Sequence, residues 1–119
     1  MDAWRHGTYI DLWSFVHFLS GALLCVLFSW VGFSFLAATL LTLVLLFTWE
    51  LYEWLLKILE PVPNVTIDIL IGFLGFIVLA YWHYFLGHAF DVVFAASLAA
   101  LTIGFSLWGF SDLLFRGYR

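Results

Sequence analysis

Apolar residues run almost without interruption through this chain of 119 residues, and charged residues are confined to a few short segments. Apolar stretches of about 20 residues with hardly a charge are typical of helices that cross a membrane. Four such stretches follow one another here, and they predict four transmembrane helices. The predicted helices cover residues 10–31, 33–59, 64–85 and 89–115.

Residues that begin or end helices separate these four stretches. Residues 32–34 (Gly-Phe-Ser) predict a tight turn, and the two prolines that precede Asn64 cannot continue a helix. Asn64 is the predicted N-cap of the third helix, because its side chain can accept a hydrogen bond from a free backbone N–H. Gly87 and His88 predict the last turn.

The composition agrees with this pattern. The chain is 66% hydrophobic and only 10% charged, whereas a soluble domain of this size carries far more charge. We therefore expect an all-α membrane protein with one domain over residues 1–119, built as a bundle of four transmembrane helices with short loops and an interfacial N-terminal arm. The net charge is −4 and the four basic residues form no cluster, which argues against nucleic acid as a partner.

The four basic residues also predict the orientation. With four spans, Arg5, Lys57, Arg116 and Arg119 all fall on the same side of the membrane. Because loops rich in Lys and Arg stay in the cytoplasm, we predict that both termini are cytoplasmic. We expect an integral protein of a bacterial inner membrane, surrounded by membrane lipids.

Two glutamates near the end of the second predicted helix are the strongest indication of function. A carboxylate at the centre of a membrane-crossing helix costs about 2.5–3.5 kcal/mol on insertion scales. Glu50 and Glu53 are three residues apart, so they share one face of the helix. Such a pair requires a cation, a hydrogen-bond donor or a bound proton nearby.

Other polar residues lie in the same half of the membrane and on compatible helix faces. We predict that His17, Glu50, Glu53 and Asp68 bind a metal ion or a polar lipid headgroup. Four further residues are expected to support this site, namely Asp11, Ser14, Lys57 and Asn64. Small residues beside the polar ones favour close helix packing, and these are Gly21, Gly72 and Gly75.

Several of these residues also have purely structural interpretations. Asn64 can serve only as a cap, and Glu53 and Lys57 have the spacing and order of a simple helical ion pair. His17 can be a core histidine with its hydrogen bonds satisfied. At the opposite end of the bundle, His83, His88 and Asp91 lie around the last loop, and we expect His88 and Asp91 at the membrane–water interface and His83 deeper in the bundle.

The ligand types narrow the chemistry. Carboxylate and amide oxygens suit Mg²⁺, Ca²⁺ or Mn²⁺, and participation of His17 would suit Zn²⁺ or Fe²⁺. No Glu-x-x-His motif follows Glu50, which disfavours a carboxylate-bridged di-iron centre. Ser14 is one turn from His17, but no strained turn presents its hydroxyl as a nucleophile. The sequence leaves open whether the protein is an enzyme.

The order of these motifs resembles the VanZ-like group and the related YjdF-type small membrane proteins. The matching positions are Asp11, His17-Phe18, Gly21, Glu50-Leu51-Tyr52-Glu53, Asn64, Asp68 and Gly75. They extend over more than half of the chain, although the usual order of acid and Asn is reversed at Asn64 and Asp68. The resemblance implies a polytopic bacterial membrane protein, linked in some members to glycopeptide tolerance and without a settled activity.

Three functions are therefore compatible with the sequence. The first is binding of a metal ion or a polar headgroup near the cytoplasmic face. The second is a non-catalytic accessory subunit of a larger membrane complex, or a homo-oligomer, in which the polar residues join helices or subunits. The third is a small proton-coupled transporter in which Glu50 takes up and releases the proton.

Overall fold

The computed structural model describes residues 12–55 and 62–116 of the chain. It contains four long helices: α1 (Leu12–Val31), α2 (Phe35–Leu55), α3 (Val62–Ala80) and α4 (Val92–Arg116), with a π-helical turn, η1 (Tyr81–Phe85), that extends α3. The predicted all-α, four-helix class is confirmed. The N-terminal arm lies outside the described residues.

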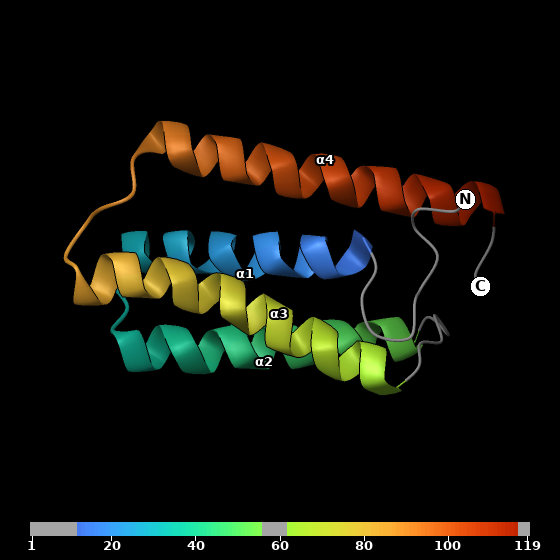
Figure 1. The fold of residues 1–119 in the computed structure, drawn as a ribbon, viewed down its shortest axis with the longest axis horizontal. Helices are drawn as coiled ribbons and strands as arrows, with labels where there is room; N and C mark the ends of the chain where they lie inside the picture. Colours follow the sequence, from blue (N-terminus) through green and yellow to red (C-terminus); the bar gives the residue numbers. More distant parts are fainter. Residues whose placement is uncertain (1–11, 56–61, 117–119) are drawn as a thin grey trace.

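All four helices are long and apolar enough to cross a membrane. The candidate spans have mean hydropathies between 1.8 and 2.1, and each contains 20 or 21 residues. A helix of 21 residues is about 31 Å long, which matches the thickness of the hydrocarbon core. The molecule measures 44 × 27 × 20 Å, with all helix axes roughly along its longest dimension (Figure 1). We therefore treat the chain as an integral membrane protein.

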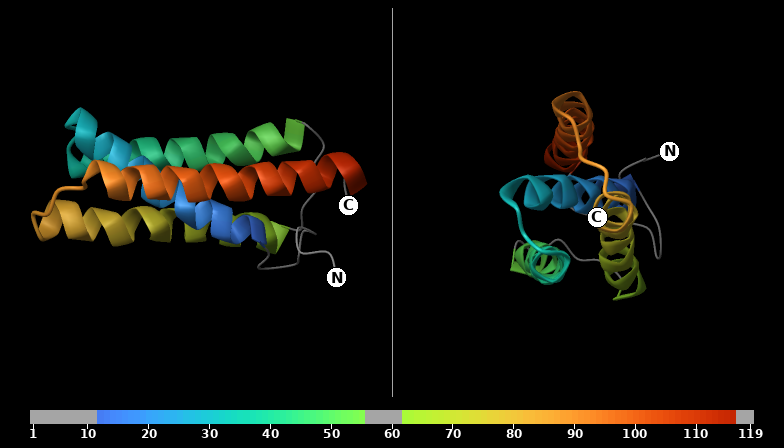
Figure 2. Two further views of the ribbon diagram at one scale, coloured as in Figure 1. Left: turned by 90° about the horizontal axis from the view of Figure 1, so that it is seen from above. Right: turned by 90° about the vertical axis from the view of Figure 1, so that its left-hand side faces the viewer.

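Helix α1 occupies the centre of the bundle. Seen end-on, it lies between α4 on one side and the pair formed by α2 and α3 on the other (Figure 2). Its most extensive contacts are with α3, while α4 packs mainly on α1. The deepest part of the apolar core follows from this arrangement, with Cys25 and Val26 of α1 meeting Phe76 and Ala80 of α3.

Glycines bring α1 and α3 into close contact. A Cβ atom built on Gly21 would lie 1.8 Å from the carbonyl oxygen of Gly72, and one built on Gly75 would lie 2.1 Å from that of Phe18. Without hydrophobic driving force between helices in lipid, close backbone approach through small residues is a main source of attraction. This crossing sets the distance between the polar residues of α1 and those of α3.

The structure corrects the predicted bounds of the third and fourth helices. Asn64 is not an N-cap, since α3 already begins at Val62 and includes Pro63, which a first helical turn tolerates because its N–H groups have no partner within the helix. Helix α4 begins at Val92 rather than near residue 89. Its cap is Asp91, whose Oδ1 accepts a hydrogen bond of 2.6 Å from the Phe94 N–H.

The other end of this helix is at Phe85, as predicted, but its last turn is not regular α-helix. The regular α-helix ends at Ala80, and the five residues of η1 form a π-turn before the loop. Here the ring of His88 stacks on Trp82 with centroids 4.1 Å apart. Nδ1 of His83 lies 2.7 Å from the His88 carbonyl oxygen. These histidines therefore stabilise the loop.

Candidate metal site on three helices

The site begins with the orientation of His17 on α1. Its Nδ1 lies 2.7 Å from the carbonyl oxygen of Trp13, one helical turn earlier. Because a carbonyl oxygen only accepts hydrogen bonds, Nδ1 must carry the proton and donate. In a neutral imidazole this leaves Nε2 with its lone pair available. A backbone carbonyl that fixes the ring in this way is the usual outer partner of a metal-binding histidine.

Glu50 of α2 meets the other nitrogen of this ring. Its Oε1 lies 3.1 Å from Nε2 of His17, and the two side chains are only 10% and 5% exposed, respectively. Two unprotonated atoms would not attract each other at this distance. The pair therefore shares a proton, either as an imidazolium beside a carboxylate or as a neutral imidazole that accepts from the acid, unless a metal ion binds both atoms.

Asp68 completes the group from α3. Its side chain is fully buried, and the hydroxyl of Ser14 on α1 donates a hydrogen bond of 2.9 Å to its Oδ1. Ser14 lies three residues before His17, so one face of α1 contacts both acids. The serine thus holds the orientation of the Asp68 carboxylate, as a neighbouring donor does for a metal-binding acid.

His17, Glu50 and Asp68 each offer one ligand atom, and these three atoms all lie within 4.8 Å of one another. With metal–ligand bonds of about 2.0–2.2 Å, neighbouring ligands of one ion are about 3 Å apart, close to the separation of His17 and Glu50. The group can therefore hold a metal ion with small side-chain movements. It draws one ligand from each of three helices.

The three residues also lie at one depth. His17 is five residues after the start of α1, Glu50 is five before the end of α2, and Asp68 is six after the start of α3. With a rise of 1.5 Å per residue, each is about 8–9 Å from the end of the described part of its helix. The relevant ends of these helices are at the same end of the molecule (Figure 1). An ion here would be close to one membrane surface.

The remaining predicted site residues are placed differently. Glu53 is buried on α2 but is not part of the group whose ligand atoms lie within 4.8 Å, since it is one turn closer to the helix end. Asp11 and Lys57 lie outside the described residues. For Asn64, the structure describes only the backbone, within the first turn of α3.

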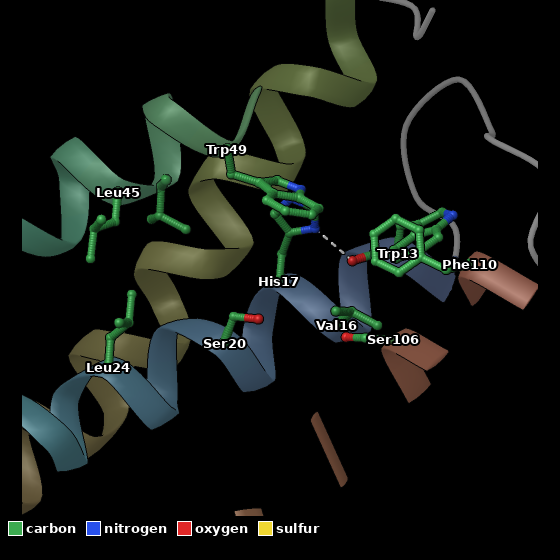
Figure 3. Close-up of a pocket in the computed structure, with 10 residues that line it drawn as sticks. Trp13, Val16, His17, Ser20, Leu24, Leu45, Trp49, Ser106 and Phe110 are labelled. Atoms are coloured by element: carbon green, nitrogen blue, oxygen red, sulfur yellow. Dashed lines mark hydrogen bonds between the residues drawn. The ribbon is translucent and has the colours of Figure 1, made fainter. Parts of the chain in front are cut away.

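A cavity of about 210 Å³ adjoins the group on the side of α4. His17 forms part of its wall, beside Trp13 on the same helix (Figure 3). Ser106 and Phe110 of α4 also line it. This contribution of α4 could not be predicted from the sequence, because Ser106 and Phe110 carry no charge that would distinguish them in an apolar helix.

Comparison of the chain with protein-family models, with curated proteins and with solved structures gives no match.

Proposed function

We propose that this protein binds one divalent metal ion inside the membrane, with His17, Glu50 and Asp68 as its protein ligands. The observation that carries the proposal is the approach of these three ligand atoms to within 4.8 Å of one another. Further support comes from the Trp13 carbonyl, which fixes the His17 ring with Nε2 towards Glu50. That arrangement prepares an imidazole for metal binding.

Charge balance favours an ion in this position. Two carboxylates buried in a membrane-crossing bundle are costly unless a cation or protons neutralise them. A divalent ion balances the charges of Glu50 and Asp68 and leaves His17 neutral. Mixed imidazole and carboxylate ligands favour Zn²⁺ or Fe²⁺ over Mg²⁺, Ca²⁺ and Mn²⁺, which prefer oxygen ligands.

The location and the family belong to the same proposal. His17, Glu50 and Asp68 are all motif positions in the resemblance to VanZ-like proteins, which supports a shared site. With both termini in the cytoplasm of a bacterium, the ion would lie near the cytoplasmic face of the inner membrane. A polar lipid headgroup could supply further ligands to it from that face.

Metal analysis of the purified protein tests the proposal. The detergent-solubilised chain is stripped with a chelator, loaded with Zn²⁺ and desalted, and its zinc content is measured. We expect one zinc per chain. Glu50→Gln, Asp68→Asn and His17→Gln should each weaken binding by at least about tenfold, because even outer-shell partners are worth that much.

Glu53→Gln is the matched control, since it removes a buried acid three residues away on the same helix. It should retain its zinc. Elution volume and helicity identify any variant that fails to fold. Equal zinc contents in the wild type and all four variants would rule out the proposed site.

The direct contact between His17 and Glu50 favours a second candidate function. In the metal-free protein these two residues hold a proton between them, as a residue pair in a proton path would. Proton flux into liposomes that is abolished by Glu50→Gln and does not depend on added metal would favour a proton-coupled transporter. Absence of flux in the wild-type protein would exclude it.

A further inference from the structure

The cavity beside His17 has its own polarity gradient. Rings from three helices surround the end that is nearest the termini: Trp13 and Phe110 have centroids 5.1 Å apart, and Trp49 and Phe110 are 6.1 Å apart. The opposite end is aliphatic and includes Leu24 and Leu45 (Figure 3). Aromatic side chains are typical of the headgroup level of a membrane, and aliphatic side chains of its hydrocarbon core. The cavity therefore has the same order of environments as a lipid molecule in a bilayer.

Two hydroxyl groups line the cavity between these ends. Ser20 comes from α1 and Ser106 from α4. Elsewhere on the helices, hydroxyls such as that of Thr102 bond back to the preceding turn. The hydroxyls of Ser20 and Ser106, by contrast, make no hydrogen bond to any residue that the structure describes. They are therefore available to a ligand inside an otherwise apolar space.

The charged residues near the cavity limit which polar group the ligand can carry. Among the described residues that line the cavity, His17 is the one that can titrate, and its two nitrogens are engaged by Trp13 and Glu50. No lysine or arginine side chain is among those that the structure describes. Among the described residues, an anionic head would thus find no lysine or arginine to pair with, and His17 is already paired with Glu50. The cavity favours an uncharged polar group attached to a hydrocarbon chain.

We propose that this cavity binds the hydrocarbon chain of an uncharged lipid alcohol or ester, whose hydroxyl or carbonyl oxygen hydrogen-bonds to Ser20 or Ser106. Lipids of this kind reach the site from the bilayer itself. The chain would lie along Leu24 and Leu45, with its polar group beside His17. This proposal goes beyond the metal site and does not require the ion to be bound.

Photolabelling of the full chain in phosphatidylcholine vesicles tests the proposal. The probe is a long-chain alcohol with a diazirine on its chain, and labelled peptides are identified by mass spectrometry. We expect saturable labelling around Leu24 and Leu45 that excess unlabelled alcohol prevents. The matched fatty acid, ionised at neutral pH, and the matched alkane without a head should label these positions several-fold less.

Variants separate the cavity from the lipid-facing surface. Leu24→Trp fills the cavity and should abolish the saturable labelling, and Ser106→Leu provides a second, smaller blockade if Leu24→Trp does not fold. Leu40 is 55% exposed on α2 and does not line this cavity, so Leu40→Trp should leave labelling unchanged. Ser20→Ala with Ser106→Ala should reduce alcohol labelling to the level of the alkane.

The two proposals can fail separately. Zinc content reports on the metal site, whereas saturable labelling reports on the cavity, and Leu24→Trp should keep its zinc. Labelling that excess alcohol does not prevent, or that Leu24→Trp leaves unchanged, would overturn the lipid proposal. Equal saturable labelling by the fatty acid would overturn the preference for an uncharged head.

Discussion

Nε2 of His17 lies 3.1 Å from Oε1 of Glu50, although 33 residues separate them in the chain. The other nitrogen of the ring faces the carbonyl oxygen of Trp13 at 2.7 Å. These two contacts determine where the protons of the imidazole reside. The protonation of Nε2 therefore depends on whether a proton or a metal ion neutralises Glu50.

The tautomer of His17 can be measured directly. We expect Nδ1 to be protonated in the metal-free protein, because only a donor can face the Trp13 carbonyl. Addition of Zn²⁺ should change the ¹⁵N shift of Nε2 and leave Nδ1 protonated. NMR of protein labelled at histidine provides the measurement, with His17→Gln to assign the signal. A ring protonated at Nε2 alone would contradict the geometry.

Metal binding should depend on pH with a defined sign. Zn²⁺ must displace the proton held between His17 and Glu50, so binding releases protons and weakens as the pH falls. Calorimetric titrations in buffers with different ionisation enthalpies measure the number of protons released. Glu50→Gln should release fewer protons than the wild-type chain. Zinc affinity that is the same at acidic and neutral pH would argue against these ligands.

The glycine crossing should be sensitive to a single methyl group. Gly21→Ala places a Cβ 1.8 Å from the Gly72 carbonyl oxygen, which is backbone and cannot move away. We expect the free energy of unfolding to fall by about 1–3 kcal/mol, the usual cost of overpacking. Gly104→Ala is the control, because a Cβ there meets nothing within 4 Å and should gain about 0.5–1 kcal/mol.

Unfolding titrations with SDS in mixed micelles measure both substitutions. Gly21→Ala should also lower zinc affinity, since it separates His17 on α1 from Asp68 on α3. Equal stability of the two variants would show that α1 and α3 do not cross at this contact.

Removal of the α4 cap should weaken that helix locally. The Asp91 carboxylate accepts a hydrogen bond from the Phe94 N–H, and its negative charge is favourable at a helix N-terminus. Asp91→Ala should cost about 1 kcal/mol, whereas Asp91→Asn, which retains the acceptor, should cost less. Hydrogen exchange at the first turn of α4 is the readout. Unchanged exchange in Asp91→Ala would contradict the cap.

Thr42 offers a stabilising substitution. Its side chain is fully buried, and its hydroxyl has no hydrogen-bond partner within the described part of the chain. Thr42→Val removes the unpaired hydroxyl and keeps the shape, so it should add about 1 kcal/mol or more. Thr39→Val is the control, because the Thr39 hydroxyl already bonds to the Phe35 carbonyl. Destabilisation by Thr42→Val would indicate an interaction of this hydroxyl in the membrane.

Much of the candidate site could be anticipated from helical periodicity. Ser14 and His17 are three residues apart, and this spacing puts them on one face of α1, where they contact Asp68 and Glu50, respectively. Periodicity could not separate Glu50 from Glu53, since both lie on one face of α2. Only the crossing of the helices determines which of the two acids is level with His17.

The contribution of α4 had no signal in the sequence. Ser106 and Phe110 resemble many other residues of an apolar helix, and their position beside His17 depends on how α4 packs on α1. The same holds for the cap at Asp91, which was expected at the interface without a specific role. Local turn chemistry likewise did not reveal that α3 starts before its proline or ends in a π-turn.

The amino-acid sequence by itself determined that the chain forms four membrane-crossing helices, because long apolar stretches and their breaks are local properties of the chain. It also determined that acids and an imidazole are placed at similar depths, since depth follows from the distance to a helix end. Only the tertiary structure decided which of them meet. The close approach of α1 and α3 through Gly21 and Gly72, together with the lateral position of α4, places His17 between two acids and beside a cavity.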